Sequence, residues 1–150
     1  MRPAAPRGAR RRRVKVLIER QRAIEMALAL PDAASDMPFE EDFDSTVLRH
    51  ADTGKWFGLV MKAPCRQVGL EREGRAEVLN LKCDPLVSYG LFREYPDIVP
   101  AYHMNKHLWI TVRLEGSVPE ETLALLIRMS YDLTAKKPPR RRKRRSDAEE

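Results

Sequence analysis

The chain has 150 residues with 28 Lys and Arg against 22 Asp and Glu, which gives a formal net charge of +6. This length fits a single domain that buries a core of its own without the help of a metal or a disulfide. No apolar run approaches the roughly 20 residues that span a membrane, and the basic N-terminus lacks the apolar segment of a secretory signal, so we expect a cytoplasmic protein.

The positive charge is concentrated at the two ends of the chain. Residues 1–15 contain seven basic side chains and no acid, and residues 136–150 contain eight basic side chains and three acids. The 120 residues between them hold 13 basic and 19 acidic side chains, a net charge of −6. We therefore predict disordered basic arms at residues 1–15 and 136–150 that flank an acidic folded domain at residues 16–135.

The apolar patterns and turn residues predict a mixed order of helices and strands. Pro31 ends a first helix, residues 51–54 suit a hairpin connection, and Asp84 followed by Pro85 is typical of a helix start. The predicted elements are a helix over residues 14–30, a loop over 32–44, strands over 43–50, 55–62, 67–71 and 76–82, a helix over 84–95, a strand over 108–115 and a helix over 119–134. This order predicts an α+β fold with a single antiparallel sheet and helices packed on one face.

Residues 102–119 contain the clearest pattern in the chain. From residue 108 to 115, apolar side chains alternate with polar or aromatic ones, as expected for a strand with one buried face. Gly116 ends this strand. Ser117 and Glu120 then have the spacing of a capping box, with Pro119 inside the first helical turn.

The same stretch resembles the MmcQ/YjbR family in its motif His103-Met104-Asn105-Lys106, in Trp109, in Thr111-Val112 and in Gly116-Ser117-x-Pro119. Further matches, within a resemblance that spans roughly residues 20–135, are Asn80-Leu81-Lys82-Cys83-Asp84-Pro85 and Tyr95-Pro96. The resemblance implies a small α+β fold of the CyaY-like type and a DNA-binding protein with a double-wing arrangement. Leu108 stands directly before the tryptophan, where the family commonly has a histidine, so no role of that histidine is carried over.

One candidate nucleic-acid surface is the sheet face that the helices leave uncovered. Alternation of side chains predicts that aromatic and basic residues share this face, which would let bases stack while cations hold phosphates. The residues expected there are Trp56, Val60, Lys62, Asn80, Lys82, Trp109, Thr111 and Arg113. The alternative is that loops cover the tryptophans or that they fill a second small core.

A second candidate is the loop that contains the family motif. His103, Asn105 and Lys106 suit contacts with phosphates or base edges in a wing-like loop. Alternatively, His103 and Asn105 bond the loop backbone and fix the turn before Trp109. Both readings remain open from the sequence.

The arms are the third candidate, because basic segments bind phosphate backbones through counterion release. The arm residues predicted to contact nucleic acid are Arg10, Arg11, Arg12, Arg13, Arg140, Arg141, Arg142, Lys143, Arg144 and Arg145. The alternative is that these arms only keep the protein in solution.

Motifs for enzyme chemistry are missing from the sequence. It contains no Gly-x-Ser-x-Gly elbow, no Gly-rich phosphate loop and no His-Glu-x-x-His. His103 and His107 are four residues apart, but no third zinc ligand is apparent, and Cys65 and Cys83 are expected to be reduced thiols. We expect no enzyme activity, metal or cofactor.

The sequence thus predicts a non-enzymatic nucleic-acid-binding protein, with DNA favoured over RNA. The alternative function is a protein-interaction module in which the acidic folded domain binds a partner protein.

Overall fold

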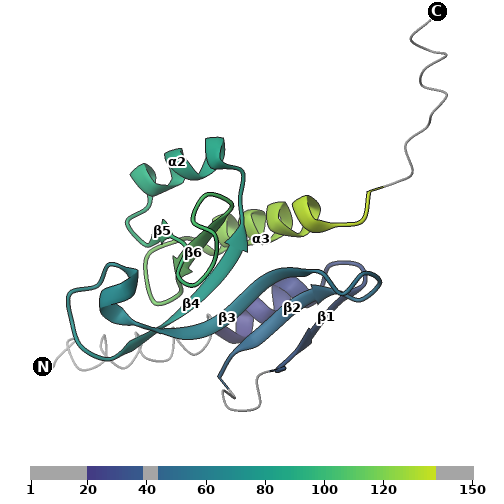
Figure 1. The fold of residues 1–150 in the computed structure, drawn as a ribbon, viewed down its shortest axis with the longest axis horizontal. Helices are drawn as coiled ribbons and strands as arrows, with labels where there is room; N and C mark the ends of the chain where they lie inside the picture. The colour runs from purple at the N-terminus through teal and green to yellow at the C-terminus, as the bar shows by residue number, and fades with distance from the viewer. Residues whose placement is uncertain (1–19, 39–43, 138–150) are drawn as a thin grey trace, which may run out of the picture.

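The computed structural model describes residues 20–38 and 44–137 (Figure 1). The arm predicted at residues 1–15 lies outside the described residues, as do residues 138–150 of the second arm. No helix within the described ranges is long and apolar enough to cross a membrane.

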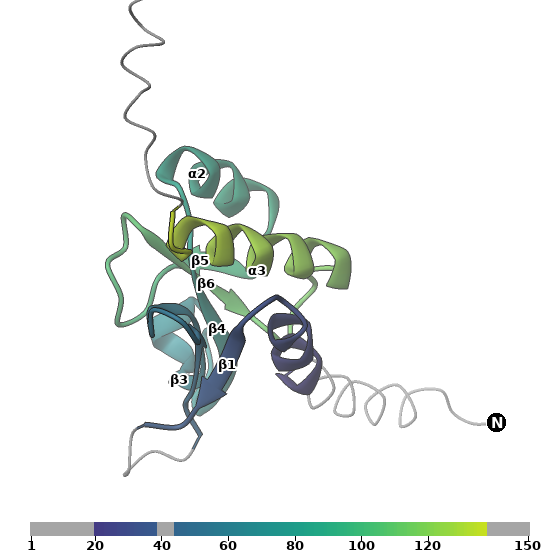
Figure 2. The ribbon, with the colours of Figure 1, turned by 90° about the vertical axis from the view of Figure 1, so that its right-hand side faces the viewer.

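The fold is an antiparallel sheet with helices on one face, which confirms the predicted α+β class (Figures 1 and 2). An N-terminal helix, described over residues 20–28, precedes the first strand. The elements that follow are β1 (Ala33–Asp36), β2 (Thr46–His50), β3 (Trp56–Pro64), the 3-10 helix η1 (Cys65–Val68), β4 (Arg75–Lys82), α2 (Pro85–Glu94), β5 (Ile98–Pro100), β6 (Trp109–Arg113) and α3 (Glu120–Thr134). The strand order is β1-β2-β3-β4-β6-β5, and every pairing is antiparallel.

Three local predictions were wrong. Residues 33–36 form β1 rather than a loop, since they pair with β2 at the edge of the sheet, where Arg49 Nε donates to Asp36 Oδ1 over 2.8 Å. The expected strand at residues 67–71 is replaced by η1. The expected loop before residue 108 contains β5, which pairs with β6.

The two faces of the sheet carry separate cores. The helix face, covered by the N-terminal helix, α2 and α3, buries the larger core, which includes Phe57, Val60, Leu79 and Ile127. The opposite face, here called the loop face, buries a smaller core. Its members are Val47, Leu59, Met61, Ala63, Val68 and Val78, with Trp56, Leu70, Val99 and Tyr102 packed against them. The sheet therefore has no open face along most of its length.

A β-bulge in β3 decides which side chains reach which face. Leu48 pairs with Gly58, but Arg49 pairs with Trp56, so Phe57 is an extra residue in β3. Phe57 therefore joins Val60 in the helix-face core. The prediction that Val60 and Lys62 share the uncovered face with Trp56 was wrong, because a single extra residue inverts the facing of a strand.

Gly58 has a steric role beside this bulge. A Cβ at Gly58 would lie 2.8 Å from Leu48 Cδ1, so the close approach of β2 and β3 requires the missing side chain.

The helix starts were predicted with mixed success. Asp84 caps α2, since its Oδ1 accepts the Leu86 N–H over 2.9 Å with Pro85 in the first turn, as expected. The capping box at Ser117 was wrong. Pro119 is the N-cap residue of α3 without a side-chain cap, and the Ser117 N–H instead donates to Asp97 Oδ2 over 2.7 Å.

Candidate functional site

The loop that carries the family motif, residues 101–108 and here called the motif loop, is closed by its own polar side chains. Asn105 Oδ1 accepts the His107 N–H over 2.8 Å, and the Asn105 carbonyl accepts the Trp109 N–H over 2.9 Å. Lys106 Nζ donates to the Ala101 carbonyl over 2.7 Å. Asn105 and Lys106 thus hold the turn before β6, which is the structural reading of the motif. Both side chains remain exposed, so this role leaves them within reach of a ligand.

His103 sits in the same loop with a backbone φ of 63°, which is uncommon for a residue other than glycine. Its ring lies 4.2 Å from the ring of Tyr102, centroid to centroid. The side chain is exposed, so an aromatic edge of the motif loop faces solvent.

A buried polar network ties the motif loop to the sheet. Asn80 on β4 and Thr111 on β6 are both 0% exposed and are cross-strand partners. Asn80 Nδ2 donates to the Tyr102 carbonyl over 3.0 Å, the Tyr102 N–H donates to Thr111 Oγ1 over 2.9 Å, and the Thr111 hydroxyl donates to Asn80 Oδ1. These two residues, expected on an open surface, instead fix the position of the motif loop.

Arg113 is not on a binding surface, which corrects the prediction that it contacts nucleic acid. It is 8% exposed, and its guanidinium donates to Asp97 Oδ1 over 2.9 Å, to the Val68 carbonyl over 2.6 Å and to the Pro96 carbonyl over 2.8 Å. Burial alone would raise the pKa of Asp97, but hydrogen bonds from Ser117 and Arg113 outweigh burial and hold that pKa below its usual value. The ion pair ties β6 to η1 and to the start of β5.

Lys62 and Trp56 also lie elsewhere than predicted. Lys62 pairs in register with Glu77, whose carboxylate bonds Arg20 of the N-terminal helix, so Lys62 is on the helix face. Its Nζ lies 3.8 Å from Asp44 Oδ2. Trp56 is partly buried against the loop-face core, with the Arg49 guanidinium carbon 6.0 Å from its ring centroid. The loop face is therefore no open stacking platform, and the alternative of a second core is the correct one.

Lys82 and Lys106 remain together near Trp109. Lys82 is the register partner of Trp109, and the Cys83 N–H donates to the Leu108 carbonyl over 2.8 Å, so the end of β4 lies against the end of the motif loop. Antiparallel pairing also brings the start of β3, after Lys55, to this end of the sheet. His50 at the end of β2 bonds Thr134 of α3 over 2.9 Å, which brings the end of α3 there too.

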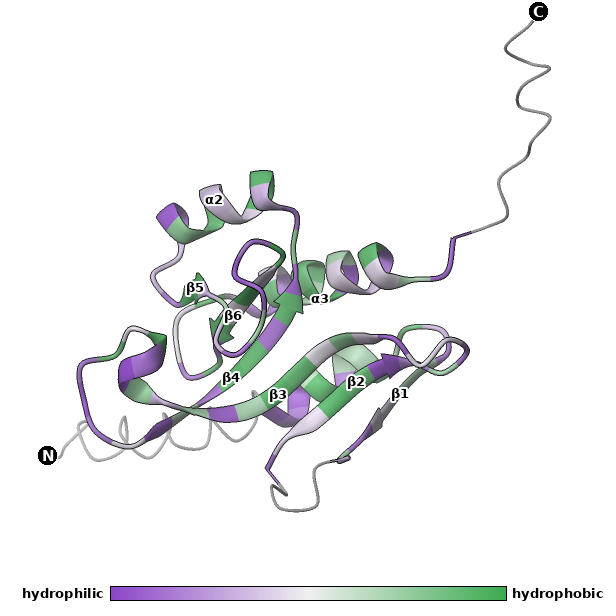
Figure 3. Cartoon of the chain, viewed as in Figure 1, coloured by the Kyte–Doolittle hydropathy of each residue, from purple (hydrophilic) through white to green (hydrophobic). Residues whose placement is uncertain are grey.

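Five lysines therefore lie on segments at the same end of the sheet, here called the lysine end: Lys55, Lys82, Lys106, Lys136 and Lys137. Within residues 20–38 and 44–137, none of them forms an ion pair, whereas Arg20, Arg49 and Lys62 do. Figure 3 shows hydrophilic segments at the motif loop and at the end of α3. Sequence reasoning missed Lys55, because only the strand pairing shows that it lies at the same end of the sheet as Lys82.

Acids also lie at the lysine end. Asp52 Oδ1 accepts the Thr53 N–H over 2.8 Å, and Asp84 caps α2. Asp132 in the last turn of α3 pairs with Arg128, and the Asp32 carbonyl accepts the Ala51 N–H beside the end of β2. None of these acids forms an ion pair with one of the five lysines within the described ranges.

The groups that could hold a metal or perform thiol chemistry are few. No cluster of three or more His, Cys, Asp or Glu suited to a metal was found among the described residues. Cys65 and Cys83 are both buried and unpaired, and burial, with the neighbouring Asp84, raises the pKa of the Cys83 thiol.

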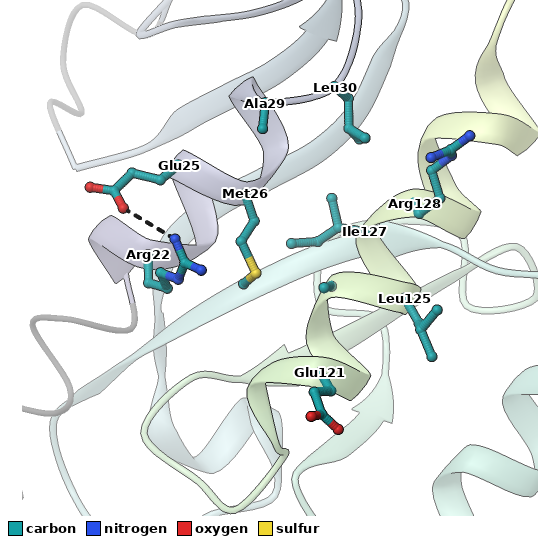
Figure 4. Close-up of a pocket in the computed structure, with 10 residues that line it drawn as sticks. Arg22, Glu25, Met26, Ala29, Leu30, Glu121, Leu125, Ile127 and Arg128 are labelled. Carbon is teal, nitrogen blue, oxygen red and sulfur yellow. Dashed lines mark ion pairs between the residues drawn. The ribbon is translucent and has the colours of Figure 1, made fainter.

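A groove of about 700 Å³ lies between the N-terminal helix and α3, on the helix face (Figure 4). Its floor is apolar, with Met26, Ala29 and Ile127, and its rim carries charges such as Arg22 and Glu25, which pair over 3.6 Å. The motif loop covers the other face of the sheet, so the groove is separate from the lysine end.

Comparison with known proteins gives a consistent family. The YjbR family model matches residues 28–133. The Bacillus subtilis protein YyaQ is 40% identical over 99 residues, which cover 66% of this chain and 83% of YyaQ. The Escherichia coli O157:H7 protein YbdF is 34% identical over 111 residues, which cover 74% of this chain and 80% of YbdF.

Solved structures share the fold. A Pseudomonas syringae protein, known from a crystal structure, is 40% identical with a TM-score of 0.71, covering 77% of this chain and 98% of that one. A Deinococcus radiodurans protein with a DUF419 domain is 30% identical with a TM-score of 0.59, covering 81% of this chain and 82% of its own.

Proposed function

This chain belongs to the YjbR family, and we propose that it binds DNA without acting as an enzyme. The observation that carries the proposal is the lysine end. Five lysines without a carboxylate partner among the described residues lie on segments at one end of the sheet, and in the sequence the arginine-rich residues 140–145 follow Lys136 and Lys137. Unpaired cations on one surface are what a phosphate backbone binds through the release of its counterions.

The acids at the other end of the sheet are too far away to weaken a phosphate contact at this surface. Glu71 and Glu73 lie before β4, at the opposite end of the sheet from Lys82. The eight residues of β4 separate them from the lysine end by roughly 25 Å, at about 3.3 Å per residue. Salt screens charges over about 8–10 Å at physiological ionic strength, so these acids have little effect on a phosphate at the lysine end.

The motif loop supplies position as well as charge. Because Lys106 Nζ is held by the Ala101 carbonyl, part of its side-chain freedom is already lost before DNA binds, which lowers the entropic cost of the contact. Trp109 is the register partner of Lys82, and His103 lies in the same loop as Lys106, so these two aromatic side chains are our candidates for contact with an unstacked base. In this proposal the basic arms increase the rate at which the protein encounters DNA, and the lysine end fixes the position of the protein along the duplex.

The test is a fluorescence-anisotropy titration of a labelled DNA duplex with the full chain at physiological salt. Lys82→Gln removes a charge whose side chain makes no hydrogen bond or ion pair within the described ranges, so we expect weaker binding with an unchanged melting temperature. Lys62→Gln is the matched control, because it removes the same charge from the helix face. Equal affinities for the parent and Lys82→Gln, with Lys106→Gln also unchanged, would exclude the lysine end as a DNA contact.

Parallel titrations with a single strand of DNA and with an RNA hairpin decide the class of nucleic acid. We expect the DNA duplex to bind most tightly. If substitution of residues 140–145 alone abolishes binding, the arms act by themselves. The acidic domain is then better explained as a module that binds a protein partner, which is the second candidate function.

A further inference from the structure

His103 keeps an exposed aromatic ring in a strained backbone conformation. Its φ of 63° lies in the left-handed region, which costs free energy in a residue with a Cβ and which glycine adopts without that cost. Strain of this kind persists where it serves a function. The side chain is exposed, whereas Trp109, the other aromatic candidate, is half-buried. His103 is therefore the aromatic residue of the motif loop that is best placed to meet a ligand.

Tyr102 gives the His103 ring a rigid support. The two rings lie 4.2 Å apart, centroid to centroid, with a tilt of 40°. The Tyr102 N–H donates to Thr111 Oγ1 over 2.9 Å, and its carbonyl accepts from Asn80 Nδ2 over 3.0 Å, with both partners fully buried. The Tyr102 side chain is half-buried and packs against the loop-face core. Because the sheet fixes Tyr102 in advance, stacking of a ligand on this pair of rings has a low entropic cost.

A cation lies close to the same pair of rings. Lys106 Nζ donates to the carbonyl of Ala101, the residue directly before Tyr102, over 2.7 Å. Standard backbone geometry then places the ammonium group within about 10 Å of the His103 Cα. One or two nucleotides span this distance, since stacked nucleotides rise by about 3.4 Å along a strand. A phosphate bound by Lys106 therefore brings a base of the same strand within reach of His103.

We propose that the Tyr102–His103 pair binds an unpaired nucleobase, so that the preferred ligand is a DNA duplex that carries one extrahelical base. This inference rests on the proposed DNA binding. In a fully paired duplex each base is stacked on its neighbours and is not free to stack on His103. An unpaired base leaves the duplex at a much lower cost and stacks on the imidazole ring, while Lys106 holds a phosphate beside it. The lysine end then gives affinity for any duplex, and His103 determines the specificity.

The test compares two duplexes of one sequence, one fully paired and the other with a single unpaired 2-aminopurine, a base whose fluorescence falls when it stacks. Both carry a fluorescein label at one end, and anisotropy titrations with the full chain at physiological salt give the two affinities. We expect the duplex with the unpaired base to bind at least about fivefold more tightly, as stacking on one aromatic side chain predicts. The fluorescence of 2-aminopurine should fall on binding.

His103→Asn separates base stacking from folding. Asparagine tolerates a left-handed backbone but has no aromatic ring, so the melting temperature should not fall. The variant should bind both duplexes with equal affinity, close to the affinity of the parent for the paired duplex, and should leave the 2-aminopurine fluorescence unchanged. His107→Asn is the matched control, because it removes an exposed histidine from the same loop, and it should keep the preference of the parent.

The outcomes distinguish this inference from the proposed function. Equal affinities of the parent for the two duplexes would overturn the inference and leave DNA binding intact. A preference that His103→Asn retains would also overturn it, and a lower melting temperature in that variant would then show that the ring serves only to pack against Tyr102. If the parent binds neither duplex, the proposed function fails and the inference fails with it.

Discussion

Replacement of Arg113 by methionine tests whether this residue is structural. The change removes three hydrogen bonds and leaves Asp97 without its cation, while methionine keeps much of the aliphatic volume. Removal of one partner from a buried ion pair costs about 3–5 kcal/mol. Because Asp97 keeps two bonds from Ser117 and its side chain is 15% exposed, we expect the lower end of that range, about 3 kcal/mol.

Urea unfolding of the full chain measures this loss. With an m value of about 1.5 kcal/mol/M, typical of a small domain, the midpoint should fall by about 2 M. Arg72→Met is the matched control, since Arg72 pairs with Glu115 at the surface and is expected to contribute at most about 1 kcal/mol. A loss below about 1 kcal/mol for Arg113→Met would refute the structural role. Weaker DNA binding by folded Arg113→Met would contradict the conclusion that Arg113 lies away from the binding surface.

Four further predictions concern the same framework. Because the pKa of Asp97 is depressed in the folded state, its ion pair stabilises the fold fully above about pH 5, and this stabilisation is lost as the pH falls below about 4. Asp97→Asn should therefore flatten the pH dependence of the urea midpoint in that range. Asn80→Leu should destabilise by about 2–3 kcal/mol in urea unfolding, because it leaves the Thr111 hydroxyl and the Tyr102 carbonyl without their partner. Asp84→Ala removes the cap of α2 and should cost about 1 kcal/mol by the same assay. Gly116→Ala would place a Cβ against the Asp97 carboxyl group and should lower the free energy of unfolding by about 1–3 kcal/mol. An unchanged midpoint would contradict that contact.

The sequence predicted the facing of β4 and β6 because a regular strand alternates side chains with a fixed period. Asn80 and Lys82 were expected on the face away from the helices, and in agreement Leu79 and Leu81, which alternate with them, are buried on the helix face. The same rule failed in β3, since the bulge at Phe57 depends on how β2 pairs with it and leaves no mark in the alternation itself. β1 and β5 were missed for a related reason, as both are short strands at the edges of the sheet.

The candidate site was predicted less well than the strands, because the sequence does not show which side chains of the loop face are buried. Alternation places Arg113 on that face, but it says nothing of η1 and the start of β5, whose carbonyls occupy the guanidinium. In contrast, Lys82 and Lys106 were singled out by the sequence, and the structure keeps them together at the end of β4. Lys55 could be added only once the antiparallel register was known.

The most direct measurement of the central claim is the salt dependence of duplex binding by the full chain and by the double variant Lys82→Gln/Lys106→Gln. Each phosphate contact on duplex DNA contributes about 0.9 to the slope of the logarithm of affinity against the logarithm of salt concentration. If both lysines contact phosphates, the double variant should lose about 2 from that slope, and Lys62→Gln should keep the parent value. Identical slopes for all three proteins would contradict the claim that the lysine end binds DNA.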